Sequence, residues 1–237
     1  MNEIIPKTVK KRRRRRRALV SCFIGLFGIT ILSIIALSLV YVDRFTVSVN
    51  DANLCLTIDE DKLERTTLLH APPVLQAFDT QYSEIPQDID DELGSKNTDH
   101  YFAYSFYLGG LGNYESINYE LSMSLTQTTQ DISDAMRVMI IRNEDRTVYA
   151  KADENGQPKS IYDNADRLGE PTIIGTTVPF EENTHIIHRP YNVLPNEFDR
   201  YTIVMWIDGW ESVDSMKGGL FQAQIKFSTI STIIEEN

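Results

Sequence analysis

A long uncharged segment that directly follows a run of arginines constrains this chain more than any other feature. Arg12 to Arg17 are six consecutive arginines, and the next 25 residues, Ala18–Val42, carry no formal charge. As an α-helix this segment would be about 37 Å long, which exceeds the roughly 30 Å hydrocarbon core of a bilayer. It is apolar on every side, as suits a helix surrounded by lipid. The sequence therefore predicts a transmembrane helix from Ala18 to Val42.

The charges beside this segment predict its orientation. Residues 1–42 contain nine Lys or Arg and one acid, and moving a positive charge outward against the membrane potential costs about 2.3 kcal/mol per 100 mV. We expect a basic cytoplasmic tail at 1–17, one membrane span at 18–42 and an extracellular domain at 43–237. The arginines Arg12–Arg17 are expected to contact anionic lipid headgroups. No small-x-small cleavage site follows the apolar run, which favours an uncleaved signal anchor over a signal peptide.

The exported part is strongly acidic. Residues 43–237 contain 14 Lys or Arg and 33 Asp or Glu. A nucleic acid, whose backbone is a polyanion, is therefore not an expected partner, whereas an extracellular protein or another envelope component is compatible with this charge. Cys22 lies in the predicted span and Cys55 outside it, so they cannot pair within one chain. We expect Cys55 to be a small buried apolar residue, with an intermolecular disulfide as the alternative.

The periodicity of the extracellular part is that of β-structure. Short segments rich in β-branched and aromatic residues are separated by loops of Gly, Pro and Asn, at 45–49, 54–58, 101–108, 117–126, 137–142, 147–151, 172–178, 186–188, 201–208 and 220–227. Residues 59–100 lose this pattern and are predicted to be rich in loops, around one short helix at Asp61–Leu69. The pattern predicts a mainly β domain, an antiparallel β-sandwich with a jelly-roll or immunoglobulin-like strand order.

One of these segments has apolar residues at both odd and even positions. In Tyr201–Asp208 the odd positions are Tyr, Ile, Met and Ile, and the even positions include Val204 and Trp206. A strand of this kind is typical of the centre of a sheet that is covered on both sides.

The last quarter of the chain carries a recognisable set of residues, namely Tyr201, Thr202, Trp206, Asp208, Gly209, Gly218, Gly219 and Phe227. In this spacing the set resembles the closing segment of a group of membrane-anchored surface proteins of Gram-positive bacteria. The architecture is also distantly similar to TasA/camelysin-type β-sandwiches. The resemblance implies an extracellular β-sandwich and no known reaction. The group often has a cysteine in the acidic stretch, but Glu211–Met216 has none, so no role of that thiol is carried over.

Two groups of side chains are candidate metal ligands. His185 and His188 are three residues apart, a spacing that suits zinc on a helix. The two isoleucines between them favour an extended strand, where such side chains point to opposite sides. Asp208, Glu211 and Asp214 offer the carboxylate oxygens that Ca²⁺ prefers. Surface histidines and a solvated acidic loop are the simpler interpretations, so we expect no cofactor, with a Ca²⁺ site as the alternative.

The sequence contains no signature of a known catalytic centre. It has no G-x-S-x-G motif, no P-loop and no recognisable Cys/His nucleophile pair. The sequence therefore predicts a non-enzymatic cell-surface protein that serves in binding or in envelope structure. Two alternatives stay open: an extracellular hydrolase that uses a metal or a carboxylate pair, and a self-assembling subunit that accepts a neighbour's strand at its sheet edge. Trp210, just after the Asp208-Gly209 break, is the aromatic residue to test for exposure and ligand contact.

Overall fold

The computed structural model describes Phe27 and residues 45–163, 172–182 and 185–233. The chain divides into two compact units, Met1–Asp43 and Arg44–Asn237, and the strands formed by the described residues belong to the second. Among the described residues, no helix is long and apolar enough to cross a membrane. The predicted span at Ala18–Val42 lies outside the described residues, apart from Phe27.

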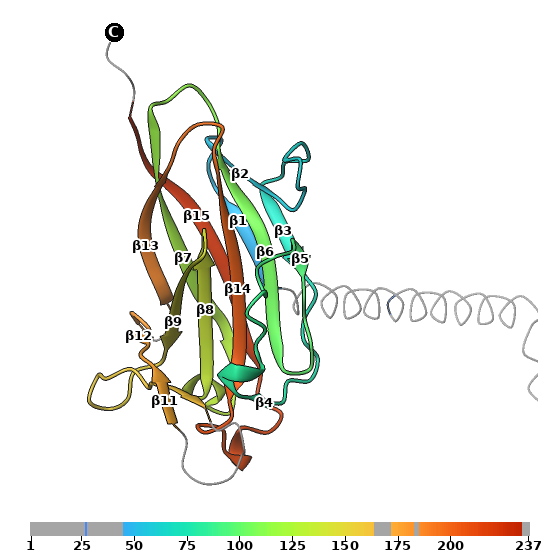
Figure 1. Ribbon diagram of the computed structural model, residues 1–237, viewed down its shortest axis with the longest axis vertical. Coiled ribbons are helices and arrows are strands. Elements are labelled where there is room, and N and C mark those ends of the chain that lie inside the picture. The colour runs from blue at the N-terminus through green and yellow to red at the C-terminus, as the bar shows by residue number, and fades with distance from the viewer. Residues whose placement is uncertain (1–26, 28–44, 164–171, 183–184, 234–237) are drawn as a thin grey trace, which may run out of the picture. The chain divides into compact units, whose positions relative to one another are not determined.

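The second unit consists mainly of strands in two large sheets (Figure 1). The smaller of the two has the order β13 (His185–Val193), β7 (Ser116–Thr128), β15 (Phe221–Ile233), β1 (Phe45–Val49) and β3 (Leu68–Ala71). The larger has the order β12 (Val178–Pro179), β9 (Asp145–Ala150), β8 (Met136–Arg142), β14 (Phe198–Asp208), β6 (Tyr101–Gly110) and β2 (Leu54–Thr57).

Short elements complete these sheets. β4 (Asp79–Thr80) pairs with β14, and β5 (Gly94–Ser95) pairs with β6. A separate two-stranded sheet is formed by β10 (Ile161–Asp163) and β11 (Thr172–Gly175), and three single 3₁₀ turns are η1 (Tyr82–Glu84), η2 (Ile132–Asp134) and η3 (Asp214–Met216). Most strand pairs are antiparallel, while β1–β15, β12–β9 and β4–β14 are parallel. The prediction of a mainly β, largely antiparallel domain is confirmed.

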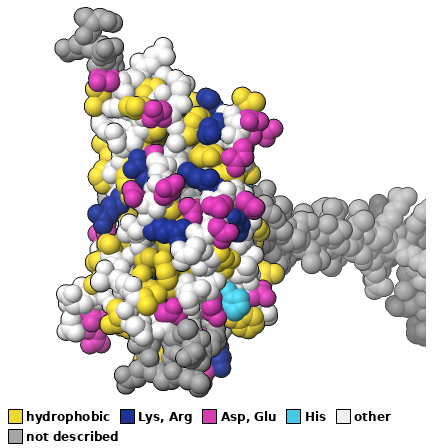
Figure 2. All heavy atoms as spheres, viewed as in Figure 1, with side chains coloured by type: hydrophobic (Ala, Val, Ile, Leu, Met, Phe, Trp, Pro, Cys, Tyr) yellow, Lys and Arg dark blue, Asp and Glu magenta, His cyan; other side chains and the backbone are white. Residues whose placement is uncertain are grey.

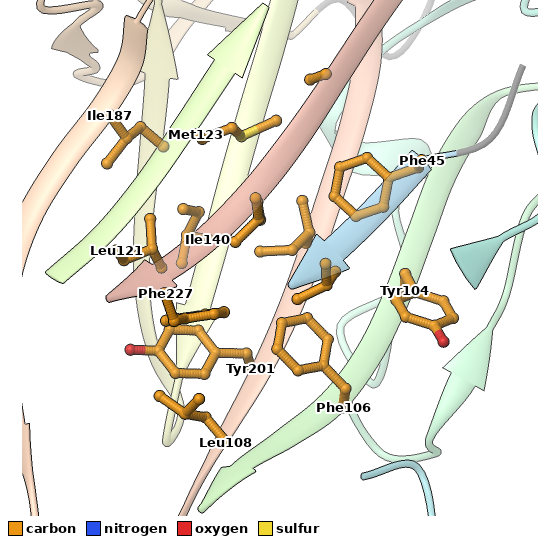
Figure 3. Packing of buried hydrophobic residues seen from close by; sticks show 14 of the residues in the cluster. Phe45, Tyr104, Phe106, Leu108, Leu121, Met123, Ile140, Ile187, Tyr201 and Phe227 are labelled. Atoms are coloured by element: carbon orange, nitrogen blue, oxygen red, sulfur yellow. The ribbon is translucent and has the colours of Figure 1, made fainter. Parts of the chain in front are cut away.

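The two large sheets face each other across one apolar core. Every second residue of β7, from Ile117 to Met123, is fully buried, as its alternating pattern predicts. These side chains meet those of the larger sheet, where the rings of Phe106 and Tyr201 stack 5.8 Å apart. Phe227 of β15 packs against the same pair of rings, with its ring centre 5.2 Å from that of Tyr201 (Figure 3).

β14 lies in the middle of the larger sheet, between β8 and β6. Its odd-numbered residues, such as Ile203, face the core between the sheets. Val204 and Trp206 face the other way into a second apolar cluster, which Ile85 and Ile89 cover. The prediction of a central strand covered on both sides is confirmed.

The predicted helix at Asp61–Leu69 is wrong. This segment consists of turns and bends until β3 begins at Leu68. The carboxylate of Asp59 accepts hydrogen bonds from the backbone N–H groups of Asp61, Leu63 and Glu64. These donors are thereby committed to a side chain, which is how Asp competes with helix formation.

Candidate functional site

The outer face of the larger sheet, which points away from the smaller sheet, carries both basic and acidic side chains. Figure 2 shows basic and acidic side chains gathered across the middle of this face, over β8, β14 and β6. The even-numbered residues of β14 and the odd-numbered residues of β6 and β8 lie on it, because the ladder pairs Arg200 with Tyr107 and Thr202 with Ile141.

A pocket of about 340 Å³ lies on this face. Its lining includes Tyr107 from β6, Ile141 from β8 and three residues of β14, namely Phe198, Arg200 and Thr202. The hydroxyls of Thr202 and Ser105 are hydrogen-bonded at 2.8 Å. β-Strand residues therefore supply much of the lining and give it a rigid support.

The most informative group in this pocket is the guanidinium of Arg200. Its Nε and Nη2 are buried and have no hydrogen-bond partner. The backbone of the same residue is fixed, since its N–H donates to Oδ1 of Asn143 at 2.8 Å and its carbonyl accepts from the N–H of Asn143 at 3.0 Å. The guanidinium carbon lies 5.8 Å from the centre of the Tyr107 ring. A positioned cation with buried unused donors is thus part of the pocket.

Two aromatic rings line the pocket together with Arg200, and two further cations lie against these rings. The rings of Tyr107 and Phe198 meet edge to face at 6.4 Å. Lys62 Nζ lies 4.5 Å from the centre of the Tyr107 ring, and the Arg65 guanidinium carbon lies 5.4 Å from that of Phe198. Both distances are within the range of cation–π attraction. The positive charges are therefore held on aromatic faces.

Carboxylates also line the pocket. Asp90 forms a 2.8 Å ion pair with Arg146, whereas Asp91 and Glu144 are exposed. Asn143 and Glu144 form the two-residue turn between β8 and β9 and have φ angles of 48° and 77°. Positive φ at both residues matches the type I′ turn of a tight hairpin. The hairpin places Glu144 at the pocket and Asn143 against Arg200.

The structure does not gather the three predicted calcium ligands into one site. Asp208 is buried, and its Oδ1 accepts hydrogen bonds from the N–H groups of Trp210 and Glu211. Burial raises the pKa of the Asp208 carboxyl, against the opposing effect of nearby Arg137.

The other two carboxylates have partners of their own. Glu211 pairs with Lys159 at 2.5 Å, and Asp214 pairs with Lys217 at 2.8 Å. Within the described part of the chain there is no group of three His, Cys, Asp or Glu side chains that could hold a metal ion.

The remaining predicted residues lie away from the pocket. His185 is on β13 with its Nδ1 3.7 Å from Glu182, and the side chain of His188 lies outside the described residues. Trp210 is 53% exposed and has its ring 6.5 Å from that of Tyr162. Cys55 is buried, as expected, and burial raises the pKa of its thiol.

Sequence reasoning missed the pocket because its parts are far apart in the chain. Lys62, Tyr107 and Arg200 come from a loop that lacks regular structure, from β6 and from β14. One local signal existed: Arg200 and Thr202 are polar and lie on the same face of β14 as the apolar Val204 and Trp206. Alternation alone does not tell which polar residue lacks a partner.

Comparisons with known proteins assign no family. No family model matches the chain, and no curated protein matches it. Among solved structures, a β-glucosidase from Kluyveromyces marxianus in complex with glucose is 11% identical, with a TM-score of 0.23. The match covers 77% of this chain and 16% of the glucosidase. A similarity at this level carries no argument about fold or activity.

Proposed function

We propose that this chain is a single-pass membrane protein of the cell surface whose β-sandwich domain binds a small ligand without transforming it. The basic run Arg12–Arg17 and the uncharged segment Ala18–Val42 support an anchor with a cytoplasmic N-terminus and an extracellular domain. The ligand would be presented by another envelope component, and it would occupy the pocket on the outer face of the larger sheet.

The observation that carries this proposal is the incomplete polar site at Arg200. Two of its guanidinium nitrogens are buried without a partner, and burying a polar group in this way costs about 1–3 kcal/mol. A ligand that accepts these hydrogen bonds would recover that cost. Aromatic walls with a few convergent polar groups are typical of small-molecule sites, and Tyr107 and Phe198 supply such walls.

The chemistry of the pocket supports binding over turnover. The hydroxyl of Thr202 has the hydroxyl of Ser105 as its hydrogen-bond partner, and a second hydroxyl is not a base that could activate it. Asp90, a carboxylate in the lining, is held by Arg146. These contacts fix the side chains in place, as a binding surface requires.

Ligand-induced stabilisation of the full chain in detergent tests the binding function. Small saccharides, amino acids and short peptides would be screened by thermal unfolding, since a ligand at 100 times its Kd stabilises the folded state by about 2.7 kcal/mol. We expect at least one ligand to raise the Tm of the wild type and of Tyr162→Ala, but not of Phe198→Ala. Tyr162 is a matched control because it is a partly exposed aromatic residue outside the pocket lining. Equal shifts in both variants, or no shift with any compound, would refute this function.

Protease treatment of intact cells tests the anchor separately. We expect the full chain to sediment with membranes and to lose its domain to external protease. A variant that lacks residues 18–42 should not sediment. Protection of the domain in intact cells would contradict the proposed orientation.

A further inference from the structure

We infer that the pocket recognises an oxyanion, a carboxylate or a phosphate group of its ligand, through the guanidinium of Arg200. This inference rests on the proposed binding function and specifies the ligand class. An arginine presents its N–H groups as a planar fork that matches these groups in a bidentate manner. Nε and Nη2 of Arg200 are the two buried nitrogens that lack a partner, and together they form one edge of that fork.

The charged side chains of the lining are Arg200 and three carboxylates, Asp90, Asp91 and Glu144, of which Asp90 is paired with Arg146. Lys62 lies against the ring of Tyr107 and Arg65 against that of Phe198. Both rings also line the pocket. In the described part of the chain, these two cations and Arg200 form no ion pair with a carboxylate. Lys62 and Arg65 are not part of the lining, and they donate hydrogen bonds to the backbone carbonyls of Glu60 and Lys62. Arg200 is therefore the cation that an anionic group in the pocket would meet.

The other groups of the pocket define the rest of the ligand. The exposed carboxylates of Asp91 and Glu144 accept hydrogen bonds, so they suit hydroxyl or ammonium donors. The rings of Tyr107 and Phe198 provide apolar contact. A volume of about 340 Å³ is near the lower end of ligand pockets. The ligand is therefore of the size of one sugar ring or a short peptide, with an oxyanion and several donors.

Pairs of probes that differ in one charge test this inference on the full chain in detergent. The pairs are glucuronic acid and glucose, glycerol 3-phosphate and glycerol, and N-acetylalanine and its amide. Isothermal titration would be performed on the wild type, Arg200→Gln, Arg200→Lys and Lys226→Gln. Lys226 is a matched control for the lost charge, since it is exposed on β15 in the other sheet. Comparison of the phosphate pair with the two carboxylate pairs distinguishes the two sources of the oxyanion.

We expect the anionic member of at least one pair to bind at least tenfold more tightly than its neutral partner. Arg200→Gln should abolish this preference, Arg200→Lys should retain only part of it because the fork is lost, and Lys226→Gln should leave it intact. A neutral probe that binds as tightly as its anionic partner, and that Phe198→Ala weakens, would refute the oxyanion inference and leave the binding function standing. An anion preference that Arg200→Gln leaves intact, or the absence of binding by all six probes, would also overturn it.

Discussion

The two faces of β14 differ in whether their buried polar side chains have hydrogen-bond partners. On the inner face, Asp199 and Tyr201 belong to a network in which every polar side chain has a partner. On the outer face, Arg200, Trp206 and Asp208 each have at least one buried polar atom without one. Alternate residues of a single strand thus serve different purposes, because a strand sends successive side chains to opposite sides.

The inner network ties the two sheets together. Asp199 accepts hydrogen bonds from Tyr119 at 2.8 Å, from Arg142 at 2.8 Å and from Asn143 at 2.6 Å. Tyr119 and Tyr201, from opposite sheets, share a hydrogen bond of 2.6 Å. Burial raises the pKa of both tyrosines, so they remain protonated donors at neutral pH. A satisfied buried network of this kind favours a single rigid arrangement.

The outer face retains unsatisfied groups. Among the described residues, the buried side-chain atoms without a partner are Nε of Arg137, Nε and Nη2 of Arg200, Nε1 of Trp206, Oδ2 of Asp208 and Oγ1 of Thr229. All but the last lie on the outer face of the larger sheet. Groups that lower stability in this way are characteristic of functional surfaces. The inner face accordingly stabilises the fold, and the outer face is the one adapted to a ligand.

Removal of the central acceptor tests the inner face most strongly. Asp199→Ala leaves Arg142 and Tyr119 without their carboxylate, and the loss of one partner of a buried ion pair costs about 3 kcal/mol or more. We expect the free energy of unfolding of the full chain to fall by about that amount, as measured by urea denaturation.

The matched control for this prediction is Asp134→Ala. Asp134 pairs with Lys151 at 2.5 Å, but both side chains are more than a third exposed, so the loss should be below about 1 kcal/mol. Equal losses in the two variants would contradict the assignment of the inner face as the main stabilising polar network.

A single methyl group tests the packing of the pocket wall on the outer face, where Gly109 of β6 is paired with Phe198 of β14. A Cβ at Gly109 would approach three atoms of the Phe198 ring more closely than van der Waals contact allows. Gly109→Ala should therefore displace that ring and cost about 1–3 kcal/mol, the usual cost of overpacking. The displaced wall should also weaken ligand binding. The control is Gly209→Ala, because a Cβ at Gly209 would make only ordinary van der Waals contacts. This variant should have little effect on binding. Gly156→Ala is less suitable, because Gly156 has a φ of 75°, which is strained for alanine.

The sequence predicted the inner face much better than the outer one. The alternation in β7 and the doubly apolar pattern of β14 could be interpreted because apolar side chains are buried preferentially, whatever their position in the chain. The boundaries were less accurate: the segment predicted at 101–108 continues as β6 through Gly109 and Gly110, where a loop was expected. Glycine there serves close packing against Phe198 and the Leu194 carbonyl, and sequence alone cannot tell that role from a turn.

The candidate site could not be predicted because it depends on which buried polar atoms lack a hydrogen-bond partner, and the sequence does not give the partners of a side chain. Asp208, Glu211 and Asp214 looked like one carboxylate cluster, yet Lys159 and Lys217 bind two of them separately. Arg200 belongs to none of the motifs that the sequence offers. Its significance arises from contacts with Tyr107 and Asn143, neither of which is its neighbour in the sequence.

The pH dependence of stability tests Asp208 on the outer face. Burial raises its pKa above the ordinary value of 3.8, so the folded protein holds the proton more tightly than the unfolded chain. Ionisation of Asp208 therefore lowers stability as the pH rises through this range. Asp208→Asn retains the Oδ1 acceptor and removes the charge, so we expect it to be more stable than the wild type at pH 7 in urea denaturation, with the difference vanishing below pH 3.8.

The control for Asp208 is Asp214→Asn, for which the sign is reversed. Lys217 lowers the pKa of exposed Asp214, so its charge contributes stability above the ordinary pKa and loses that contribution as the pH falls. A wild type that is more stable than Asp208→Asn at pH 7 would show that attraction to Arg137 outweighs burial.

The two tryptophans provide the most sensitive and least disruptive comparison, between the outer face of β14 and the turn that follows this strand. Trp206 is 1% exposed and Trp210 is 53% exposed, and the chain contains no other tryptophan. Trp210→Phe should change stability by less than about 0.5 kcal/mol and leave a fluorescence emission at short wavelength that acrylamide hardly quenches. Trp206→Phe should leave an emission at longer wavelength that acrylamide quenches readily. If Trp206 is quenched as efficiently as Trp210, water reaches its indole N–H, and the outer face is then open to solvent beyond the pocket at Arg200.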